Sequence, residues 1–556
     1  MVDILIIAGY LLVVFLIGIV RVGNLKNVKD FAIGPRNLSL GIVVVLITAT
    51  RIGGGSLIAL SAEVYKDGIF FLTLKFATLI NIIIYIKYIF PKLDNLHTIS
   101  PGGIVGKYIG SSGQIVLGIT GALVCIGRIS VQLICIGAIL EYFFKIPVYW
   151  SLLITGGILV IYASYGGIRS VIATDIIQVS FILISIPILY NISLNFLGGY
   201  ETIIQQIPEK FHFNYNVVFF ASLFFMYVFP TLEVNTLHLY TIVNDSAIFK
   251  KAYIISAILD FAFTGMAAIC GVFAYKLNPN LSPNLALPFL VDTALPYGLK
   301  GIVIAGLLAA CMSTADAYLN TFSLLMIEDI IKPISRWVRA IKKLDFLRII
   351  KIISLIGGAS AIFFSSYKGS LFEFMQFTTG FWTKIVAGPL LSLVLLRNIS
   401  IRSYFIASFI GLFTSIILNK ISEYYALFFS TNFITLLISF ISCLLMNIKK
   451  IHSYTVRNPF SKSVFKIKKI FLKAMGAIDE ALLNRFNEKS IPYNFFVTFV
   501  VCYYFLPYFL WENKFAIIST DIIVLRFISG ILCISLLFQD NWPLVLKRSS
   551  HIYVFL

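Results

Sequence analysis

The chain has 556 residues, of which 59% are hydrophobic and only 12% charged, and its mean hydropathy is +0.94. Soluble domains carry about 25% charged residues, so this composition excludes a soluble enzyme and a nucleic-acid-binding protein. The recurring apolar runs are of helix length, which excludes a β-barrel. The net charge of +19 needs no nucleic-acid partner, because membrane proteins collect Lys and Arg in their cytoplasmic loops.

Thirteen apolar runs are long enough to cross a lipid bilayer as helices. They fall at 3–21, 39–62, 69–91, 114–139, 147–165, 168–193, 215–238, 252–275, 300–326, 349–366, 375–396, 401–419 and 425–446. A polar, basic stretch separates them from two further runs at 493–512 and 516–538. We therefore predict an all-α polytopic membrane protein with a thirteen-span core over 1–446, a basic cytoplasmic linker over 447–492 and an additional membrane segment pair over 493–556.

The distribution of basic residues predicts the orientation. With the N-terminus outside, the inner loops and the linker hold 29 Lys and Arg residues, against seven in the outer loops. Because short cytoplasmic loops are enriched in Lys and Arg, we expect an integral multi-pass protein of the bacterial inner membrane with its N-terminus outside.

Two of the predicted spans contain helix breakers near their middle. The run 39–62 carries Gly53-Gly54-Gly55-Ser56, and the run 215–238 carries Pro230 followed by Thr231 and Glu233. Gly and Pro are common in membrane helices, but these two spans lie five apart in the count. Interrupted helices at corresponding positions of two halves are typical of inverted-repeat transporters, so spans two to six and seven to eleven are predicted to form the two repeats.

Three stretches carry a family resemblance. They read D-F-A-I-G-P-R-N-L-S-L-G, A-T-R-I-G-G-G-S and A-E-V-Y-K-D-G-I within 30–69, then Y-G-G-I-R-S-V-I-A-T-D-I-I-Q at 165–178, and L-P-Y-G-L-K-G-I-V-I-A-G-L-L-A-A-C-M-S-T-A-D-A at 295–317. They resemble the sodium:solute symporter family, which includes sodium/proline, sodium/pantothenate and sodium/sugar cotransporters. The resemblance implies a LeuT-like core of inverted five-helix repeats and symport driven by a sodium gradient.

The resemblance also implies a sodium site. Its ligands would be the backbone carbonyls of Ala49 and Ile52 beside the glycine run, and the carbonyl of Ala310 with the hydroxyls of Ser313 and Thr314 on a facing helix. Hydroxyls in membrane helices also bond to their own helix or hold two helices together, which is the alternative for the last two residues.

Asp175 lies near the cytoplasmic start of the sixth span, where the family carries an aspartate associated with cation coupling. An ionisable group inside a span is costly and suggests function, although a structural pair with Arg169 is the alternative. Asp316 belongs to the third motif, and we expect it to face a polar seam without a role of its own.

The solute is expected against the broken helices, because the start of a half-helix offers free N–H groups to a carboxylate. The candidate residues are Gly53, Gly54, Gly55, Ser56, Gln132, Glu233 and Asn235. Gln132 could instead join two helices, and Glu233 could lie near the cytoplasmic mouth. Proline or a similar amino or carboxylic acid is the expected solute. Sugars fit less well, because we expect the pocket to be apolar and short of amide and carboxamide groups.

The interiors of the predicted spans, away from their ends, hold Arg51, Lys75, Arg128 and Lys384. Each costs about 2.5–3.5 kcal/mol at the bilayer centre, so we expect these side chains to face the bundle and to be paired. Arg51 lies between two proposed sodium ligands. Either it pairs with Asp260 or Asp316, or its fixed charge partly replaces the ion, which would make the protein sodium-independent or a sensor.

The C-terminal extension adds a second possibility. Residues 525–543 resemble the membrane part of symporter-linked sensor histidine kinases, and the basic run at 465–473 suits the anionic inner leaflet. The alternative function is therefore an input module that reports to a separate kinase. An enzyme is not expected: the five histidines are scattered, and neither metal-ligand spacing, a nucleophile elbow nor a P-loop is present.

Overall fold

The computed structural model describes residues 2–20, 27–34, 37–94, 96, 98–199, 217–335, 345–365, 371–397, 399–425 and 431–447. The predicted linker from residue 448 onward and the segment pair 493–556 lie outside these residues. All regular secondary structure in the described ranges is helical, which agrees with the predicted all-α fold.

The helices follow the predicted spans in order. Those of the first repeat and the helix before it are α1 (Val2–Val20), the bent pair α3 (Leu40–Arg51) and α4 (Gly54–Asp67), α5 (Thr73–Ile84) with α6 (Phe90–Leu93), α8 (Ser111–Phe144), and α9 (Val148–Ser151) with α10 (Gly157–Phe196). Those that follow are α12 (Val217–Val228) with α13 (Val234–Ile242), α14 (Ser246–Leu277), α16 (Leu299–Leu324) with α17 (Lys332–Ser335), α18 (Phe346–Phe364), α19 (Leu371–Trp382) with α20 (Gly388–Leu396), α21 (Ile401–Tyr425) and α22 (Thr431–Met446). Three short helices, α2 (Val28–Ala32), α7 (Pro101–Ile109) and α15 (Ala286–Ala294), lie between them.

Within the described ranges, nine helices are long and apolar enough to cross a membrane, or ten when α3 and α4 count as one bent span. The described residues of all thirteen predicted runs are nevertheless helical apart from the breaks and the run ends. Helix α10 and the helical turns before it contain the runs 147–165 and 168–193. The two runs meet at a kink at Gly167, whose φ is 55°. The seventh run is divided between α12 and α13, and α22 has only 16 residues.

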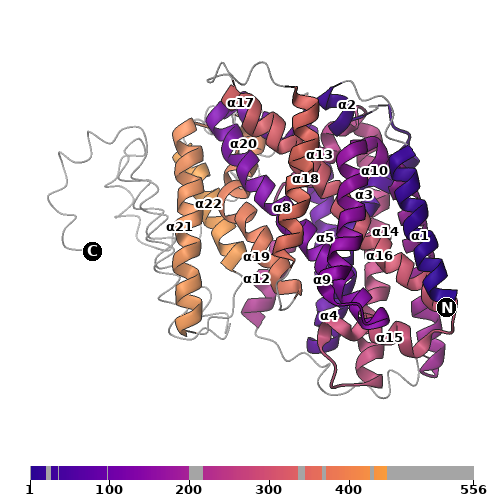
Figure 1. The fold of residues 1–556 in the computed structure, drawn as a ribbon. Coiled ribbons are helices and arrows are strands. Elements are labelled where there is room, and N and C mark those ends of the chain that lie inside the picture. Colours follow the sequence, from indigo (N-terminus) through magenta and orange to yellow (C-terminus); the bar gives the residue numbers. More distant parts are fainter. Residues whose placement is uncertain are drawn as a thin grey trace, which may run out of the picture. The chain divides into compact units, whose positions relative to one another are not determined.

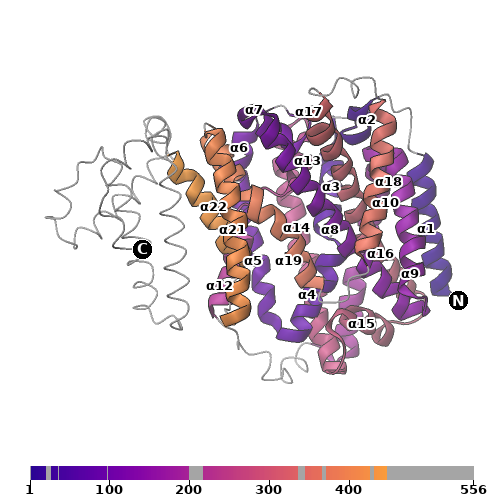
Figure 2. The ribbon, with the colours of Figure 1, turned by 60° about the vertical axis from the view of Figure 1, so that its left-hand side comes forward.

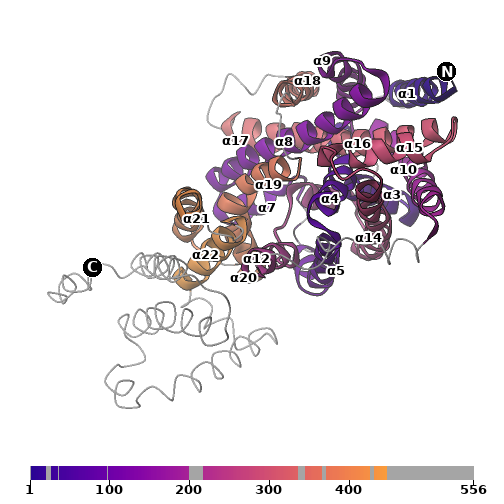
Figure 3. The same ribbon diagram turned by 90° about the horizontal axis from the view of Figure 1, so that it is seen from below.

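The chain divides into two compact units, one of Met1–Tyr215 with Phe224–Trp382 and the other of Asn216–Leu223 with Thr383–Leu556. In the first unit, α16 packs against both α8 and α10, and the view from below shows it beside α8 (Figure 3). Its span is 94% buried, because the motif L-A-A-C-M-S-T-A-D-A offers small side chains on every face and lets neighbouring backbones approach. Helix α1 packs on α10 and α16 (Figure 1).

The described part of the second unit is built on α20, α21 and α22, and α21 runs beside α22 (Figure 2). Polar contacts join these helices: the Ser439 hydroxyl donates to the Ala407 carbonyl at 3.1 Å, and the Asn447 amide donates to the Ser403 hydroxyl at 2.8 Å. Lys384, one of the four cations in the interiors of the predicted spans, belongs to this unit.

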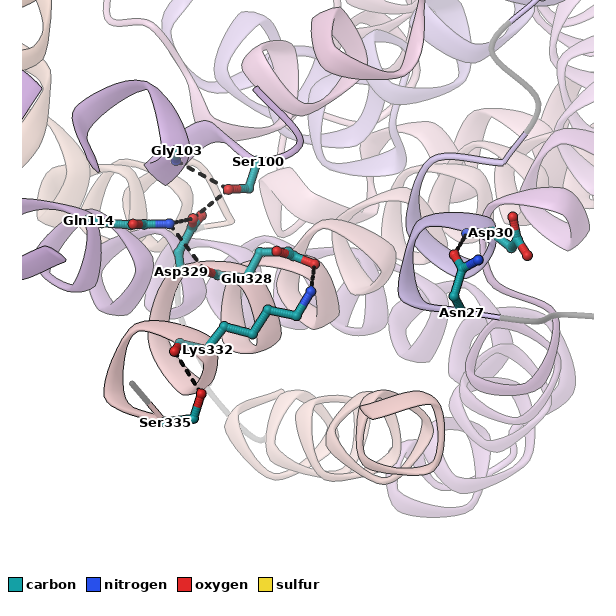
Figure 4. A network of polar contacts seen from close by, with 9 residues as sticks. All are labelled: Asn27, Asp30, Ser100, Gly103, Gln114, Glu328, Asp329, Lys332 and Ser335. Carbon is teal, nitrogen blue, oxygen red and sulfur yellow. Dashed lines mark hydrogen bonds and ion pairs between the residues drawn. The ribbon is translucent and has the colours of Figure 1, made fainter. Parts of the chain in front are cut away.

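A buried carboxylate joins the end of the α16 segment to α7 and α8 (Figure 4). Asp329 accepts hydrogen bonds from the Ser100 hydroxyl at 2.5 Å, the Gly102 N–H at 2.9 Å and the Gln114 side chain at 2.9 Å. These three hydrogen bonds satisfy the carboxylate and offset the energetic cost of burying it. One turn further on, Lys332 pairs with Glu328.

Asp94, just beyond the end of α6, makes a similar junction with α13 and α14. It accepts hydrogen bonds from Tyr240 and Ser246, and Lys250 lies 2.8 Å away. Burial acts to raise the pKa of Asp94, but the hydrogen bonds from Lys250, Ser246 and Tyr240 outweigh it, and the pKa lies below its ordinary value. The junction is therefore ionised at neutral pH.

The close packing of α14 against α4 at Gly271 can be tested by adding a side chain there. A Cβ added to Gly271 would lie 2.3 Å from the Ser61 carbonyl oxygen. Gly271→Ala should therefore lower the free energy of unfolding by about 1–3 kcal/mol through overpacking, seen as a lower melting temperature of the purified protein. On the same helix, the nearest atom to a Cβ at Gly265 is 4.0 Å away, so Gly265→Ala is the matched control. Equal melting temperatures for the two variants would contradict this packing.

Candidate functional site

The first helix break lies between α3 and α4. Helix α3 ends at Arg51, Ile52 leaves the helical conformation with φ −92° and ψ 68°, and α4 begins at Gly54 with its axis bent by 46°. A break leaves carbonyls at the end of α3 without partners in their own helix. At membrane depth such groups persist where protein surrounds them or where they line a cavity.

Hydroxyl groups of α16 face this break. The Thr314 hydroxyl donates to the Ala49 carbonyl at 2.9 Å, and the Ser313 hydroxyl contacts the same carbonyl at 3.2 Å and the Ala310 carbonyl at 3.3 Å. All three residues and Ala49 are buried. The structure thus brings together four of the five predicted sodium ligands, and the fifth, Ile52, is buried at the break itself.

This oxygen cluster fits a sodium ion chemically. Its members are neutral carbonyl and hydroxyl oxygens, hard donors of the kind that replace the hydration shell of an alkali cation. The Thr314 hydroxyl crosses to α3, and Ser313 does so as well as contacting its own helix. Hydrogen bonding within α16 alone therefore does not account for these two side chains.

The glycine run faces two directions. A Cβ on Gly53 would lie 2.5 Å from the Thr314 hydroxyl oxygen, and one on Gly54 would meet the Cys311 sulfur at 2.0 Å. Both glycines therefore lie against α16. The N–H of Gly55 donates to the Gln132 side chain on α8 at 3.0 Å.

A cavity of about 290 Å³ opens beside the break, entirely within the first unit. Of the seven predicted solute residues, Gly55, Ser56, Glu233 and Asn235 line it, whereas Gly53, Gly54 and Gln132 do not. The expectation of an apolar pocket short of amides is wrong, because Asn81, Asn235 and Gln376 all line the cavity. Span-by-span hydropathy could not show this, since these polar side chains come from different helices and converge only in the fold.

The second break, between α12 and α13, forms another wall of the cavity. Helix α12 ends at Val228 and α13 begins at Val234, with Pro230 between them. Leu232 has a φ of 52° and is fully buried. A non-glycine residue in this conformation is held there by its surroundings.

Side chains from neighbouring helices satisfy the backbone of this unwound segment. The contacts are Asn81 donating to the carbonyls of Val228 (3.0 Å) and Phe229 (3.1 Å), Trp382 donating to the Thr231 carbonyl (2.8 Å), and the Leu232 N–H donating to the Tyr85 hydroxyl (2.8 Å). Sequence reasoning missed these residues. The signal available was weak: polar or aromatic side chains with a donor or acceptor, inside apolar spans.

Charged side chains also meet in the cavity. Lys75 pairs with Asp260 at 3.2 Å, and Arg128 pairs with Glu233 at 3.4 Å. Tyr318 donates to the same oxygen of Glu233 at 2.5 Å. The expectation that Lys75 and Arg128 face the bundle with partners is therefore confirmed.

Arg51 behaves differently. Its guanidinium carbon lies 4.3 Å from the centre of the Tyr253 ring. Pairing with Asp260 or Asp316, the first of the two alternatives for Arg51, is not among the ion pairs of the described residues: Asp260 pairs with Lys75, and Asp316 accepts a hydrogen bond from Tyr162 at 2.7 Å. At the last residue of α3 the side chain reaches into the cavity, where the face of an aromatic ring attracts it.

Asp175 is fully buried on α10. Within the described ranges neither of its carboxylate oxygens has a hydrogen-bond partner, and no ion pair joins it to Arg169. The structural pair considered as an alternative for Asp175 is therefore not formed between these described side chains.

Comparison with known proteins gives a consistent result. The family model of the sodium:solute symporter family matches residues 31–411. Similar proteins include the sodium/sialic acid symporter of Aliivibrio fischeri (26% identity, 52% of this chain and 62% of that protein) and the sodium-coupled monocarboxylate transporter 1 of Xenopus laevis (22%, 70% and 67%). The sodium/glucose cotransporter of Vibrio parahaemolyticus is 22% identical over 60% of this chain and 69% of its own length.

Among solved structures, a sodium-coupled sialic acid symporter in a substrate-bound outward-open state matches with a TM-score of 0.67 at 18% identity, covering 80% of this chain and 96% of that one. This similarity confirms the predicted LeuT-like fold. The chain spans 62% of the length of the Aliivibrio relative and about two thirds of the other two. These relatives are transporters, which confirms the expectation that the protein is not an enzyme.

The hydrogen bond from the Leu232 N–H to the Tyr85 hydroxyl can be tested by mutation. Tyr85→Phe leaves the buried Leu232 N–H without its partner, and the free energy of unfolding should fall by about 1–3 kcal/mol. The measurement is the melting temperature of the purified protein. Tyr149→Phe, at a residue that is 65% exposed, should leave it unchanged. A Tyr85→Phe protein as stable as the original would show that the segment does not depend on this contact.

Proposed function

The chain belongs to the sodium:solute symporter family, and from this premise we propose that it is a secondary active transporter in which sodium entry drives symport of a small organic solute by alternating access. One observation carries the proposal. The Ala49 carbonyl at the break of α3 and α4 meets the hydroxyls of Ser313 and Thr314 on α16 within 3.2 Å. A cation held there would tie a broken helix to the central helix of the unit, and movement of one against the other would be coupled to the ion.

The proposed sodium ligands are the carbonyls of Ala49, Ile52 and Ala310 and the hydroxyls of Ser313 and Thr314. In the described geometry the two hydroxyls donate toward the Ala49 carbonyl. When sodium binds, rotation of the hydroxyl hydrogens would turn oxygen lone pairs toward the ion. The cage itself is neutral, so the bound ion brings an uncompensated positive charge into the membrane.

We assign Asp175 an accessory role in cation coupling. It supplies a carboxylate that is buried and lacks a hydrogen-bond partner in the described ranges. A buried carboxylate left in this way is costly, and a second cation would offset that cost.

The cavity beside the break is the proposed solute site, with Gly55, Ser56, Glu233 and Asn235 as contact residues. Gly53, Gly54 and Gln132, first proposed as contacts, are assigned a positioning role, since the two glycines lie against α16 and Gln132 holds the Gly55 N–H. Proline or a similar amino or carboxylic acid remains the proposed solute. The charged lining supports it, because an acid needs a cation at its carboxylate.

We also propose a location in a bacterial inner membrane with the N-terminus outside, based on the 29 basic residues of the inner loops and linker against seven outside. The alternative function is the input module of a two-component system that reports to a separate kinase through residues 447–556. The resemblance of 525–543 to the membrane part of symporter-linked kinases favours it.

The proposed sodium site predicts that removal of the Thr314 hydroxyl weakens sodium binding. Thr314→Val keeps the side-chain shape but removes one ligand, so the sodium concentration at half-maximal thermal stabilisation should rise at least about tenfold. The melting temperature is followed against sodium, with choline keeping the ionic strength constant. Ser323→Ala is the control on the same helix, because its hydroxyl bonds within α16 to Leu319 at 2.8 Å. An unchanged midpoint in Thr314→Val would refute the assigned ligand.

Deleting 447–556 separates the two functions. A transporter core should keep sodium-driven uptake in reconstituted vesicles, because the proposed ion and solute sites lie within residues 47–382. Intact uptake combined with loss of a signalling response in cells would favour the sensor. Loss of uptake on deletion, in a protein that still melts cooperatively, would contradict the assignment of transport to the core alone.

A further inference from the structure

Among the described residues, one positive charge in the cavity, that of Arg51, has no carboxylate within ion-pair distance. Five ionisable side chains of Lys, Arg, Asp and Glu line it: Arg51, Lys75, Arg128, Glu233 and Asp260. Both carboxylates are engaged, Asp260 by Lys75 and Glu233 by Arg128. In the part of the chain that the structure describes, no carboxylate lies within 4.0 Å of the Arg51 guanidinium. The cavity therefore carries one net positive charge.

The surroundings of Arg51 leave this charge available to a ligand. The Arg51 guanidinium carbon lies 4.3 Å from the centre of the Tyr253 ring, and Arg51 is also a hydrogen-bond partner of the Tyr253 side chain, so Tyr253 partly compensates the charge. A guanidinium also has five N–H donors arranged in a plane, and these match the two oxygens of a carboxylate. The single hydroxyl oxygen of Tyr253 can accept from at most two of these five donors, which leaves the others for a ligand.

We propose that Arg51 binds the carboxylate of the transported solute, and that the solute is an organic monocarboxylate with one net negative charge. This inference rests on the proposed transport function and narrows it. A zwitterionic amino acid would also need an acidic partner for its ammonium group, and both acidic side chains of the cavity are already paired. A single negative charge neutralises the cavity.

The position of Arg51 also links the solute to sodium. Arg51 lies in the sequence between Ala49 and Ile52, whose carbonyls are the proposed ligands from the broken helix, and its own carbonyl accepts from the Ser56 hydroxyl at 3.2 Å. A guanidinium so close in the chain repels the incoming cation, and a carboxylate bound to it offsets that repulsion. Each ligand should therefore strengthen the binding of the other by the same factor.

The test compares acids with their uncharged amides. Purified full-length protein is titrated with propionate, pyruvate and L-lactate, each beside its amide, and with L-proline and glucose, and the melting temperature is recorded in sodium and in choline. At least one of the carboxylates should stabilise the protein in sodium while its amide does not. The same carboxylate should lower the sodium concentration needed for half-maximal stabilisation.

Variants identify the residue responsible. Arg51→Gln should weaken carboxylate binding by roughly 10- to 100-fold, the loss expected for a charge-assisted hydrogen-bonded contact. Arg51→Lys keeps the charge without the planar donors and should be intermediate. Lys87→Gln removes an exposed cation that does not line the cavity and should bind like the original.

The outcomes separate this inference from the proposed function. The inference is overturned if no carboxylate of the panel stabilises the protein, if the amides bind equally well, or if Arg51→Gln binds the acid like the original. Sodium alone should still stabilise Arg51→Gln, which shows that the variant is folded and its ion site intact. Sodium-dependent binding of glucose or proline, without binding of the carboxylates, would support the proposed symport function and contradict the proposal that the solute is a monocarboxylate.

Discussion

A helix that breaks inside a bilayer exposes backbone groups that lipid cannot satisfy, and the first unit of this protein is organised around two such breaks. At the second break, Asn81, Trp382 and Tyr85 hold the carbonyls and the N–H of the unwound segment. At the first, hydroxyls of α16 face the Ala49 carbonyl. The second break is therefore satisfied by side chains of neighbouring helices, whereas at the first break the partners are also suitable ligands for a cation.

Charge balance then decides what else can bind. The oxygen cage is neutral, and the paired side chains of the cavity cancel, so sodium and the Arg51 guanidinium would be two uncompensated positive charges in one region. Like charges repel more strongly in a protein interior than in water. A carboxylate bound to Arg51 cancels one of the two charges and so offsets the repulsion.

The parts of the site that are local in sequence could be predicted from it. The glycine run and the Ser313-Thr314 pair each lie in one short motif, and the structure brings them together as the family resemblance implied. The pairing of the cations could not be predicted. Lys75 and Asp260 lie 185 residues apart, and the sequence shows that a cation lies in a span without showing which carboxylate faces it.

The direction in which each residue of the glycine run faces could not be predicted from the sequence either. Successive residues of a helix point about 100° apart, so a small uncertainty in where α4 begins decides which glycine lies against α16 and which beside the cavity. Hydropathy located the spans because it sums over many residues. It could not identify the polar side chains that converge in the cavity, such as Asn81 and Gln376.

Equilibrium binding of radioactive sodium to the purified protein tests the central claim most directly, namely that the break between α3 and α4 holds the coupling ion. A sodium site at the break predicts saturable binding that unlabelled sodium displaces and potassium does not. It also predicts that Gly53→Ala, whose added Cβ would lie 2.5 Å from the Thr314 hydroxyl oxygen, abolishes this binding in a folded protein. Saturable binding that survives in Gly53→Ala, or no saturable binding in the original chain, would contradict the claim.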